Sequence, residues 1–245
     1  MSHVYKIIAA ARKENRKLFA VLIDPDDLND GQLTSLMQSG EACVDLIFVG
    51  GSLVRAQSTR TCIDRIKEVT GKPVVLFPGS ILQVVDNADA LFFLSLISGR
   101  NPEMLIGNHV IAAPMIKQTQ LEVIPTGYML IDGGQATTVS YISNTFPIPR
   151  TKYDIAACTA MAGELLGLKV LYMDAGSGAK HPIPPEMISA VRQSTDLPII
   201  AGGGICTPEQ VIAACHAGAD VIVVGNAIES NSSLLDVLGT AVKSA

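Results

Sequence analysis

Charged residues are scarce in this chain, at 17% of its 245 residues, and the formal net charge is −5. Nucleic-acid binding needs a basic surface, so this shortage of Lys and Arg argues against a nucleic-acid partner. Apolar runs long enough to cross a bilayer, about 20 residues, are also missing. Residues 1–17 are charged and predict a helix, without the apolar core of a signal peptide. We therefore expect a cytosolic protein that could still touch a membrane surface.

Several familiar catalytic and metal-binding patterns are missing too. The five cysteines lack CxxC spacing and the four histidines lack metal-ligand spacing, which argues against a zinc site. No Ser-His-Asp arrangement or Walker loop is present. The GxGxxG fingerprint is also missing, which argues against a nicotinamide cofactor. We expect the cysteines to be buried thiols in a reducing compartment; they are Cys43, Cys62, Cys158, Cys206 and Cys215.

The 48% of hydrophobic residues form runs that alternate with amphipathic segments, which is typical of buried parallel strands joined by helices. Eight such repeats predict an α/β fold, a closed (β/α)8 barrel, as one domain over residues 1–245. We expect strands at Leu18–Asp24, Leu46–Gly50, Pro73–Phe77, Ala90–Leu96, Glu122–Leu130, Lys169–Asp174, Pro198–Gly202 and Val221–Gly225. We expect helices at Val4–Glu14, Gly31–Gly40, Gln57–Thr70, Pro102–Lys117, Tyr153–Leu166, Pro185–Ser194, Pro208–Ala217 and Asn231–Lys243.

Two connections depart from a regular barrel. The segment between Phe77 and Ala90 is short and opens with Pro78-Gly79, so the third helix should be reduced or missing. Residues 131–150 form an insertion after the fifth strand, with a turn at 132–134 and a stiff, extended stretch at 147–150. Such a loop is either a lid or binding loop over the active-site face or an oligomer contact, and the sequence favours neither.

Glycine-rich turns follow the last three strands, and they predict a phosphate site. Backbone N–H groups exposed by glycine, with a helix N-terminus behind them, can hold a phosphate group. The turn after the sixth strand also carries Ser177, whose hydroxyl can donate to a phosphate oxygen. The glycines and the flanking residue concerned are Gly176, Gly178, Gly203, Gly204, Gly225 and Asn226.

The first and second strands end in residues that suit a divalent cation. Asp24 follows an apolar strand, and Ser52 follows Gly50-Gly51. Mg²⁺ takes oxygen ligands and often needs one or two protein groups plus substrate phosphates. In the alternative interpretation, the Asp24–Asp27 segment caps a helix through Asp26 or Asp27, and Ser52 is a helix cap.

Tyr172 and Asp174 have the same parity on the sixth strand and should face the same side. A carboxylate beside a polyol can orient a hydroxyl group and act as a general base. Pairing with an arginine is the structural alternative for Asp174. His181 is a further, weaker candidate for the barrel mouth.

These segments together resemble the geranylgeranylglyceryl phosphate synthase family, which includes bacterial heptaprenylglyceryl phosphate synthases. The resemblance covers about Leu18 to Glu229 and includes the AGSGA form of the strand-six motif. The matching blocks are LIDPDD at 22–27, VGGSLV at 49–54, TGYMLIDGG at 126–134, SNTFPIPR at 143–150, YMDAGSGA at 172–179, AGGGICTPEQ at 201–210 and VVGNAIE at 223–229.

The resemblance implies an Mg²⁺-dependent prenyltransferase that joins sn-glycerol 1-phosphate to a polyprenyl diphosphate through an ether bond. It implies that Asp24 and Ser52 bind the metal, and that Asp24 and Asp174 are catalytic. Asp174 stands where the family commonly has Glu, which shortens the reach of the carboxylate. The resemblance also suggests a homo-oligomer, a dimer or a hexamer. The implied sn-glycerol 1-phosphate site comprises Tyr172, Met173, Asp174, Ala175, Gly176, Ser177, Gly178, Gly203, Gly204, Gly225 and Asn226.

A prenyl tail needs an apolar groove, for which Phe77, Phe92, Phe93 and Leu96 are candidates. The alternative is the barrel core or helix packing, which we favour for at least half of them. Two other functions stay open from the residues. One is another phosphate-binding barrel enzyme, such as a sugar-phosphate isomerase or synthase, although no Lys lies at a predicted strand end. The other is a barrel that binds a phosphorylated ligand without catalysis.

Overall fold

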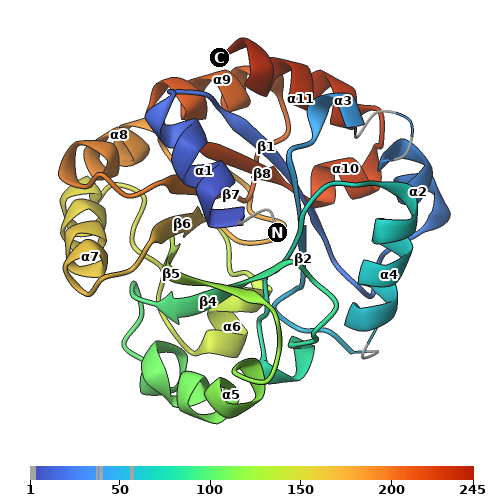
Figure 1. Ribbon diagram of the computed structural model, residues 1–245. Coiled ribbons are helices and arrows are strands. Elements are labelled where there is room, and N and C mark those ends of the chain that lie inside the picture. The colour runs from blue at the N-terminus through green and yellow to red at the C-terminus, as the bar shows by residue number, and fades with distance from the viewer. Residues whose placement is uncertain (1–3, 37, 39–40, 56–57) are drawn as a thin grey trace.

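The chain forms a closed barrel of eight parallel strands, in which each strand pairs with the next and β8 pairs with β1. This computed structural model describes residues 4–36, 38, 41–55 and 58–245. Figure 1 shows the strands surrounded by helices. The strands are β1 (Leu18–Ile23), β2 (Leu46–Val49), β3 (Val74–Leu76), β4 (Ala90–Leu96), β5 (Glu122–Leu130), β6 (Val170–Asp174), β7 (Ile199–Gly202) and β8 (Val221–Val224).

The predicted barrel and all eight predicted strands are confirmed to within one residue at each end. The outer helices also agree, although the predicted helix ends at Gly40 and Gln57 lie outside the described residues. The helices are α1 (Val4–Lys13), α2 (Asp30–Ser35), α3 (Glu41–Cys43), α4 (Thr59–Val69), η3 (Glu103–Gly107), α5 (Asn108–Ile116), α6 (Thr138–Ser143), α7 (Tyr153–Leu165), α8 (Pro185–Ser194), α9 (Pro208–His216), α10 (Asn226–Ser230) and α11 (Leu234–Ser244).

Alternation along the strands divides the apolar residues into two cores, because successive side chains point to opposite faces. One core lies between the strands and the outer helices. The other fills the barrel interior, where Phe48, Phe92 and Tyr172 are fully buried in mutual contact. Val4 and Ile8 of α1 join the interior core, so α1 closes the N-terminal end of the barrel.

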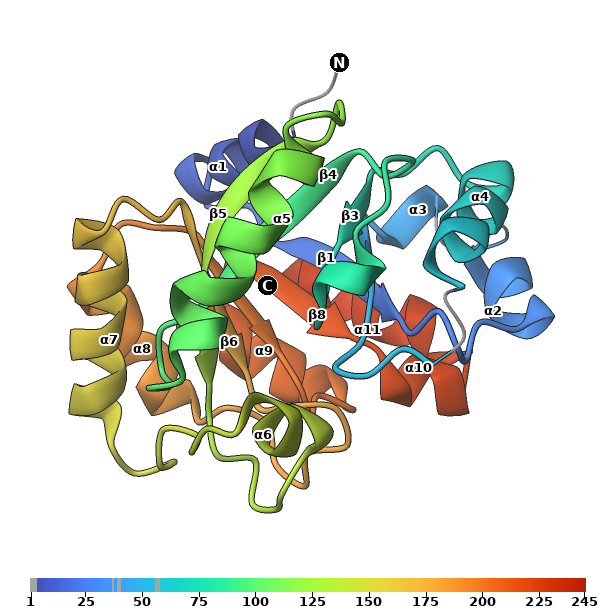
Figure 2. The same cartoon turned by 90° about the horizontal axis from the view of Figure 1, so that it is seen from below.

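The third helix is reduced to a single 3₁₀ turn, η2 (Ile81–Gln83), as the short connection predicted. The insertion after β5 differs from the expectation of a turn and an extended stretch alone, because it also contains α6. A reciprocal capping box between Thr137 and Ser140 starts this helix. Residue Ile148 is extended as predicted and bridges to Ile131. Figure 2 shows α6 and α1 at opposite ends of the barrel, so the insertion lies at the C-terminal mouth.

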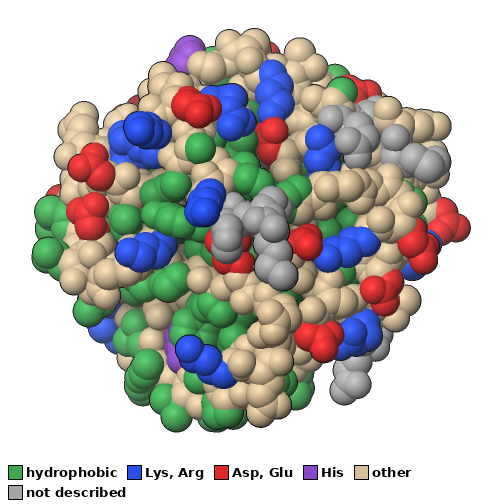
Figure 3. All heavy atoms as spheres, viewed as in Figure 1, with side chains coloured by type: hydrophobic (Ala, Val, Ile, Leu, Met, Phe, Trp, Pro, Cys, Tyr) green, Lys and Arg blue, Asp and Glu red, His purple; other side chains and the backbone are tan. Residues whose placement is uncertain are grey.

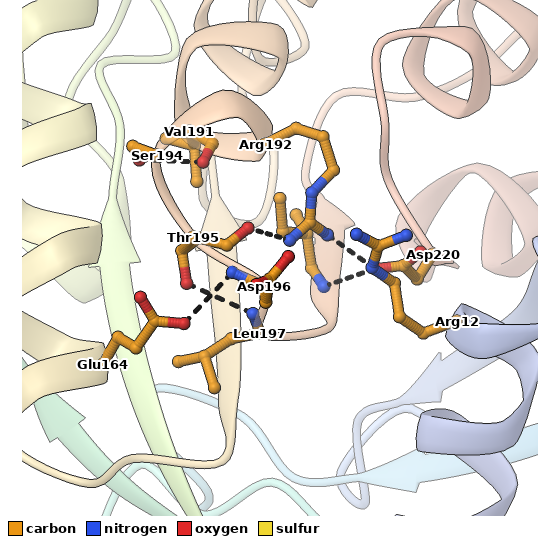
Figure 4. Close-up of polar contacts among 10 residues, drawn as sticks. Arg12, Glu164, Val191, Arg192, Ser194, Thr195, Asp196, Leu197 and Asp220 are labelled. Carbon is orange, nitrogen blue, oxygen red and sulfur yellow. Dashed lines mark hydrogen bonds and ion pairs between the residues drawn. The ribbon is translucent and has the colours of Figure 1, made fainter.

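Aspartates that directly precede three of the strands connect neighbouring strands at the N-terminal rim. Asp45, Asp89 and Asp220 each accept the backbone N–H of a residue at the start of the preceding strand, at 2.8, 2.8 and 2.9 Å. Asp220 is the most buried of them, and the guanidinium groups of Arg192 and Arg12 converge on it at 3.2 and 3.8 Å (Figure 4). Acidic and basic side chains are intermixed on this face (Figure 3).

The expectation that all cysteines are buried is wrong for two of the five. Cys158 on α7 and Cys206 in the turn after β7 are exposed, whereas the other three are buried. Cys158 lies on the side of α7 away from the buried Ala156 and Ala160, and Cys206 lies at the C-terminal mouth of the barrel; the sequence pattern resolved neither position. Among the described residues, no helix is long and apolar enough to span a bilayer.

Candidate active site at the mouth of the barrel

The C-terminal mouth contains a polar cavity, open to solvent, that is lined by most of the predicted site residues. They come from five strand ends, because the carboxyl ends of parallel strands meet at one rim. Residues Met173 and Ala175 point away from the cavity and pack in the outer core, and Gly176 does not line it. The predicted residues that line it are Asp24, Ser52, Tyr172, Asp174, Ser177, Gly178, Gly203, Gly204, Gly225 and Asn226.

The glycine turns after β6, β7 and β8 adjoin one another on one side of this cavity. Gly203 has a φ of +83°, and a Cβ added there would lie 2.7 Å from Asp174 Oδ1 and 2.8 Å from two backbone nitrogens. A side chain at this position would therefore push into the strand-six turn. The Ser177 hydroxyl donates to Asn226 Oδ1 at 2.8 Å, which joins the turns after β6 and β8.

The helix ends behind these turns differ from the expectation. At the start of α9, Thr207 and Gln210 form a capping box, and Gln210 Oε1 also accepts the Cys206 N–H at 2.7 Å. Side chains therefore already accept the N–H groups of Cys206, Thr207 and Gln210. Helix α10, which the sequence pattern did not predict, begins at Asn226 directly behind the β8 turn.

Asp174 lies on the cavity floor with both carboxylate oxygens engaged. Oδ2 accepts the Tyr128 hydroxyl at 2.5 Å, and Oδ1 accepts the Gly176 N–H at 2.8 Å. Burial raises the pKa of Asp174, while the hydrogen bonds from Tyr128 and Gly176 lower it. Burial, together with the Asp174 charge, raises the pKa of Tyr128, so Tyr128 stays protonated and donates. The alternative pairing of Asp174 with an arginine is not seen among its contacts.

Tyr128 was missed as a functional residue by the sequence reasoning, although it lies within the 126–134 block. The register of β5 against β6 places it beside Tyr172. Tyr128, Tyr172 and Phe77 form an aromatic cluster with ring centroids 4.5–5.9 Å apart. Strand parity could have shown that Tyr128 faces inward, but not that it reaches Asp174.

Asp24 lines the polar cavity at the end of β1, the strand that pairs with β8, and its carboxylate is directed at the β2 turn. Its Oδ1 accepts the Asp26 N–H at 3.0 Å, and a Cβ added to Gly51 would lie 2.6 Å from Oδ2. Burial first, and then the charges of Asp27 and Asp26, raise the pKa of Asp24. Burial, followed by the charges of Asp27 and Asp24, raises the pKa of Glu229, which also lines the cavity.

The helix-cap interpretations of this segment are wrong. The N-cap of α2 is Asn29, whose capping box with Gln32 leaves the preceding aspartates uninvolved. Asp26 instead accepts the Arg55 N–H at 2.6 Å and the Ser58 hydroxyl at 3.2 Å. Ser52 lies before α4, whose N-cap position is Ser58.

The donors present suit a magnesium ion that shares its ligands with a substrate. Within the described residues, no three His, Cys, Asp or Glu side chains come together as a metal-binding group. A carboxylate crowded by like charges is nevertheless stabilised by a cation, and Mg²⁺ is commonly held by one or two carboxylates plus phosphate oxygens. Asp24, with the neighbouring Ser52 hydroxyl, meets that description.

Gln83 holds the turn that carries Ser52. This buried side chain donates to Gly51 O at 2.7 Å and accepts the N–H groups of Gly51 and Gly79, each at 3.3 Å. The reduced third helix is thus tied to the β2 turn. Nothing in the sequence singled out Gln83.

A second, apolar cavity adjoins the first. It extends between β4, α5, η2 and α6, along the flank that a full third helix would cover. Phe77, Phe92, Phe93 and Leu96 all line it, and Phe92 is also fully buried in the interior core. His109, a further lining residue, packs edge-on against Phe93 and contacts the Ser95 hydroxyl at 3.3 Å.

The two cavities meet at Gly51, Ser52, Phe77 and Tyr128, which line both. The insertion forms part of both walls: Thr138 lines the polar cavity, and Val139 and Ile142 line the apolar one. It also packs on the strand-six turn, since Gly133 O accepts the His181 N–H at 3.0 Å. His181 itself is exposed and does not line the polar cavity.

A closed barrel with glycine turns at one side of its mouth and an adjoining apolar cavity is the architecture of a barrel enzyme whose site has a polar and an apolar compartment. Residues 10–243 match the PcrB family. The geranylgeranylglyceryl phosphate synthase of Chitinophaga pinensis is 55% identical over 243 residues, covering 99% of this chain and 96% of that protein. Its counterpart from Spirosoma linguale is 50% identical over 238 residues, covering 97% and 96%.

The solved structures agree. The crystal structure of (S)-3-O-geranylgeranylglyceryl phosphate synthase from Thermoplasma acidophilum, in complex with its substrate sn-glycerol-1-phosphate, superposes with a TM-score of 0.93 at 32% identity and covers 100% of both chains. The chain belongs to the PcrB family. It is an enzyme of the prenyltransferase class, as the resemblance in sequence predicted, and the two alternative functions are set aside.

Proposed function

We propose that this chain joins sn-glycerol 1-phosphate to a polyprenyl diphosphate, releasing diphosphate, and that it uses Mg²⁺ held at Asp24 and Ser52. The observation that carries the proposal is the meeting of a polar and an apolar cavity at Ser52, Phe77 and Tyr128. A donor with an anionic head and an apolar tail fits across that junction. The glycerol phosphate fits beside it, with its phosphate on the glycine turns.

The proposed chemistry is a substitution at the first carbon of the prenyl chain. The bond from the glycerol C3 oxygen to that carbon forms while the bond to the diphosphate oxygen breaks. The hydroxyl proton passes to the Asp174 carboxylate, whose raised pKa makes it a better base than an ordinary aspartate. Each of its oxygens has a further lone pair beyond the one used by Tyr128 or Gly176. Bound Mg²⁺ would offset the charge on the departing diphosphate.

The direct test is product formation from sn-glycerol 1-phosphate and geranylgeranyl diphosphate, with Mg²⁺ or with a chelator, followed by mass spectrometry. We expect an ether-linked prenylglyceryl phosphate in the reaction with Mg²⁺ and none in the reaction with the chelator. The mirror-image compound, sn-glycerol 3-phosphate, is the matched control and should react poorly. Equal yields with chelator present would contradict the metal assignment.

Replacing Tyr128 by phenylalanine should move the acidic limb of the pH–rate profile to higher pH. The hydrogen bond from Tyr128 lowers the pKa of Asp174, so its loss lets burial raise that pKa further. Because the base must be deprotonated, turnover should fall most at low pH. Tyr172→Phe is the matched control: Tyr172 contributes no hydrogen bond to that shift, so the limb should stay in place. An unmoved limb in Tyr128→Phe would remove Tyr128 from this role.

Replacing Ala112 by phenylalanine should shorten the donor that the enzyme accepts. Ala112 is a buried residue of α5 that lines the apolar cavity, and a phenyl ring there would occupy its volume. Each CH₂ group of the tail that is no longer buried costs about 0.8 kcal/mol, so displacing two or more should lower kcat/KM for geranylgeranyl diphosphate roughly tenfold or more. The short donor geranyl diphosphate serves as the internal control. A parallel loss for both donors would show that the tail does not reach Ala112.

We also propose a cytosolic enzyme of one domain that assembles as a dimer or a hexamer. Five cysteines without a disulfide suit a reducing compartment. Exposed apolar side chains on α5, among them Val110 and Ile111, offer surface for an oligomer contact.

A further inference from the structure

Three large apolar side chains stand out from the surface at the C-terminal mouth. Leu82 of η2 is 78% exposed, Tyr141 of α6 is 85% exposed and Phe146 in the insertion is 93% exposed. We call these three residues the apolar rim. Exposed apolar groups that lie together mark contact sites for proteins or membranes. Both aromatic residues come from the insertion, for which the sequence left the function open.

The apolar rim continues the lining of the apolar cavity outward. Leu82 follows Ile81, which lines the cavity, and Tyr141 precedes Ile142, which lines it from the other side. The segment before Phe146 is held against the loop after β4: Asn101 Nδ2 donates to Ser143 O at 2.7 Å. Leu82 and Tyr141 are therefore next in sequence to residues that line the cavity, and α6, which carries Tyr141, lies at the barrel end opposite α1 (Figure 2).

We propose that the apolar rim docks on a lipid bilayer, so that the donor's tail passes from the membrane into the apolar cavity without crossing water. This inference rests on the proposed function, because it takes the cavity to be the tail site. Each CH₂ group moved from lipid into water is unfavourable, and a long polyprenyl chain would resist leaving the bilayer. Tyrosine is also enriched where protein meets the lipid headgroup region.

A second copy of the chain fits this surface less well. A protein partner seated on Leu82 and Tyr141 would cover the cavity between them and obstruct the entry of the tail. A bilayer covers the same surface and supplies the substrate through it. Since the protein carries a net charge of −5, the attraction should come from apolar insertion rather than from anionic lipids.

The test is flotation of the full chain with vesicles of phosphatidylcholine, a lipid without net charge. We expect the wild-type protein to float with the vesicles at both low and high salt. The double variant Tyr141→Ser/Phe146→Ser should reduce the floated fraction about tenfold. The matched control is Leu165→Ser/Leu166→Ser, which removes two exposed leucines at the end of α7 and should float like the wild type.

Turnover supplies the second readout. With geranylgeranyl diphosphate embedded in vesicles, the rim variant should be slow, whereas with water-soluble geranyl diphosphate it should match the wild type. Tyr141 and Phe146 line neither cavity, so the basal reaction is preserved.

If wild-type protein fails to float, or the rim and control variants float equally, the proposal is wrong. A rim variant that changes the molecular mass by light scattering, with flotation unchanged, would assign the surface to a second copy instead. Flotation measures vesicle binding without any reaction. If only the proposed chemistry is wrong, the protein will still float but will form no product with either donor.

Discussion

Asp24→Asn is expected to lower turnover by about three orders of magnitude while leaving the fold unchanged. The amide oxygen of asparagine can still accept the Asp26 N–H that Asp24 Oδ1 now accepts at 3.0 Å. What disappears is the negative charge that faces the β2 turn and Ser52. Stabilisation of the leaving diphosphate by a metal ion is worth several kcal/mol, and each 1.36 kcal/mol changes the rate tenfold.

Steady-state kinetics across a series of Mg²⁺ concentrations measures this effect. The metal concentration for half-maximal rate should rise in Asp24→Asn, which separates metal binding from a general structural defect. Asp27→Asn is the matched control, because Asp27 lines the same cavity edge and contributes to the raised pKa of Asp24. Its loss should cost much less. Comparable losses in the two variants would show that Asp24 is not the principal ligand.

Asp220→Ala should lower the free energy of unfolding by about 3 kcal/mol. Asp220 is 2% exposed, accepts the Ile199 N–H at 2.9 Å and neutralises Arg192 at the N-terminal rim. Removing one partner of a buried ion pair leaves the other charge uncompensated, which typically costs 3–5 kcal/mol. The lower end applies here because Arg12 and Arg192 retain access to water.

Urea unfolding of Asp220→Ala and Asp89→Ala together tests this reasoning. Asp89 has the same position before its strand and accepts the Val74 N–H at 2.8 Å, but it is 38% exposed and its partner is Lys67. A hydrogen bond and a solvent-exposed ion pair are each worth about 1 kcal/mol or less, so Asp89→Ala should cost roughly 1 kcal/mol. Equal losses of unfolding free energy at the two positions would mean that burial does not determine how much these aspartate contacts stabilise the fold. Both residues lie at the end of the barrel opposite the mouth, so activity of the folded protein should persist.

Much of the site could be predicted because its parts are local. Asp24, Ser52 and the glycine turns each follow directly from an apolar run, and the carboxyl ends of parallel strands share one rim. The absence of a full third helix was also visible, as a connection too short to hold one. The apolar cavity along β4 and α5, which this absence creates, was not visible in the sequence.

The errors concern choices between equivalent local candidates. Asp26, Asp27 and Asn29 can all cap a helix, and the chain uses Asn29, because Asp26 is engaged with Arg55 from another strand end. Helix α6 was overlooked because glycines and prolines around it dominate the pattern. The two exposed cysteines show the same ambiguity, since a small apolar residue fits either face of a turn or an outer helix.

The amino-acid sequence by itself determined the eight strands, the order of the glycine turns and the acidic end of the first strand, because hydrophobic period and turn chemistry are encoded in adjacent residues. Tertiary structure alone decided which side chains from distant segments meet. Tyr128 reaches Asp174 across 46 positions, and Gln83 reaches Gly51 across 32. These contacts depend on strand register around a closed barrel, a property of all eight strands together that no single segment contains.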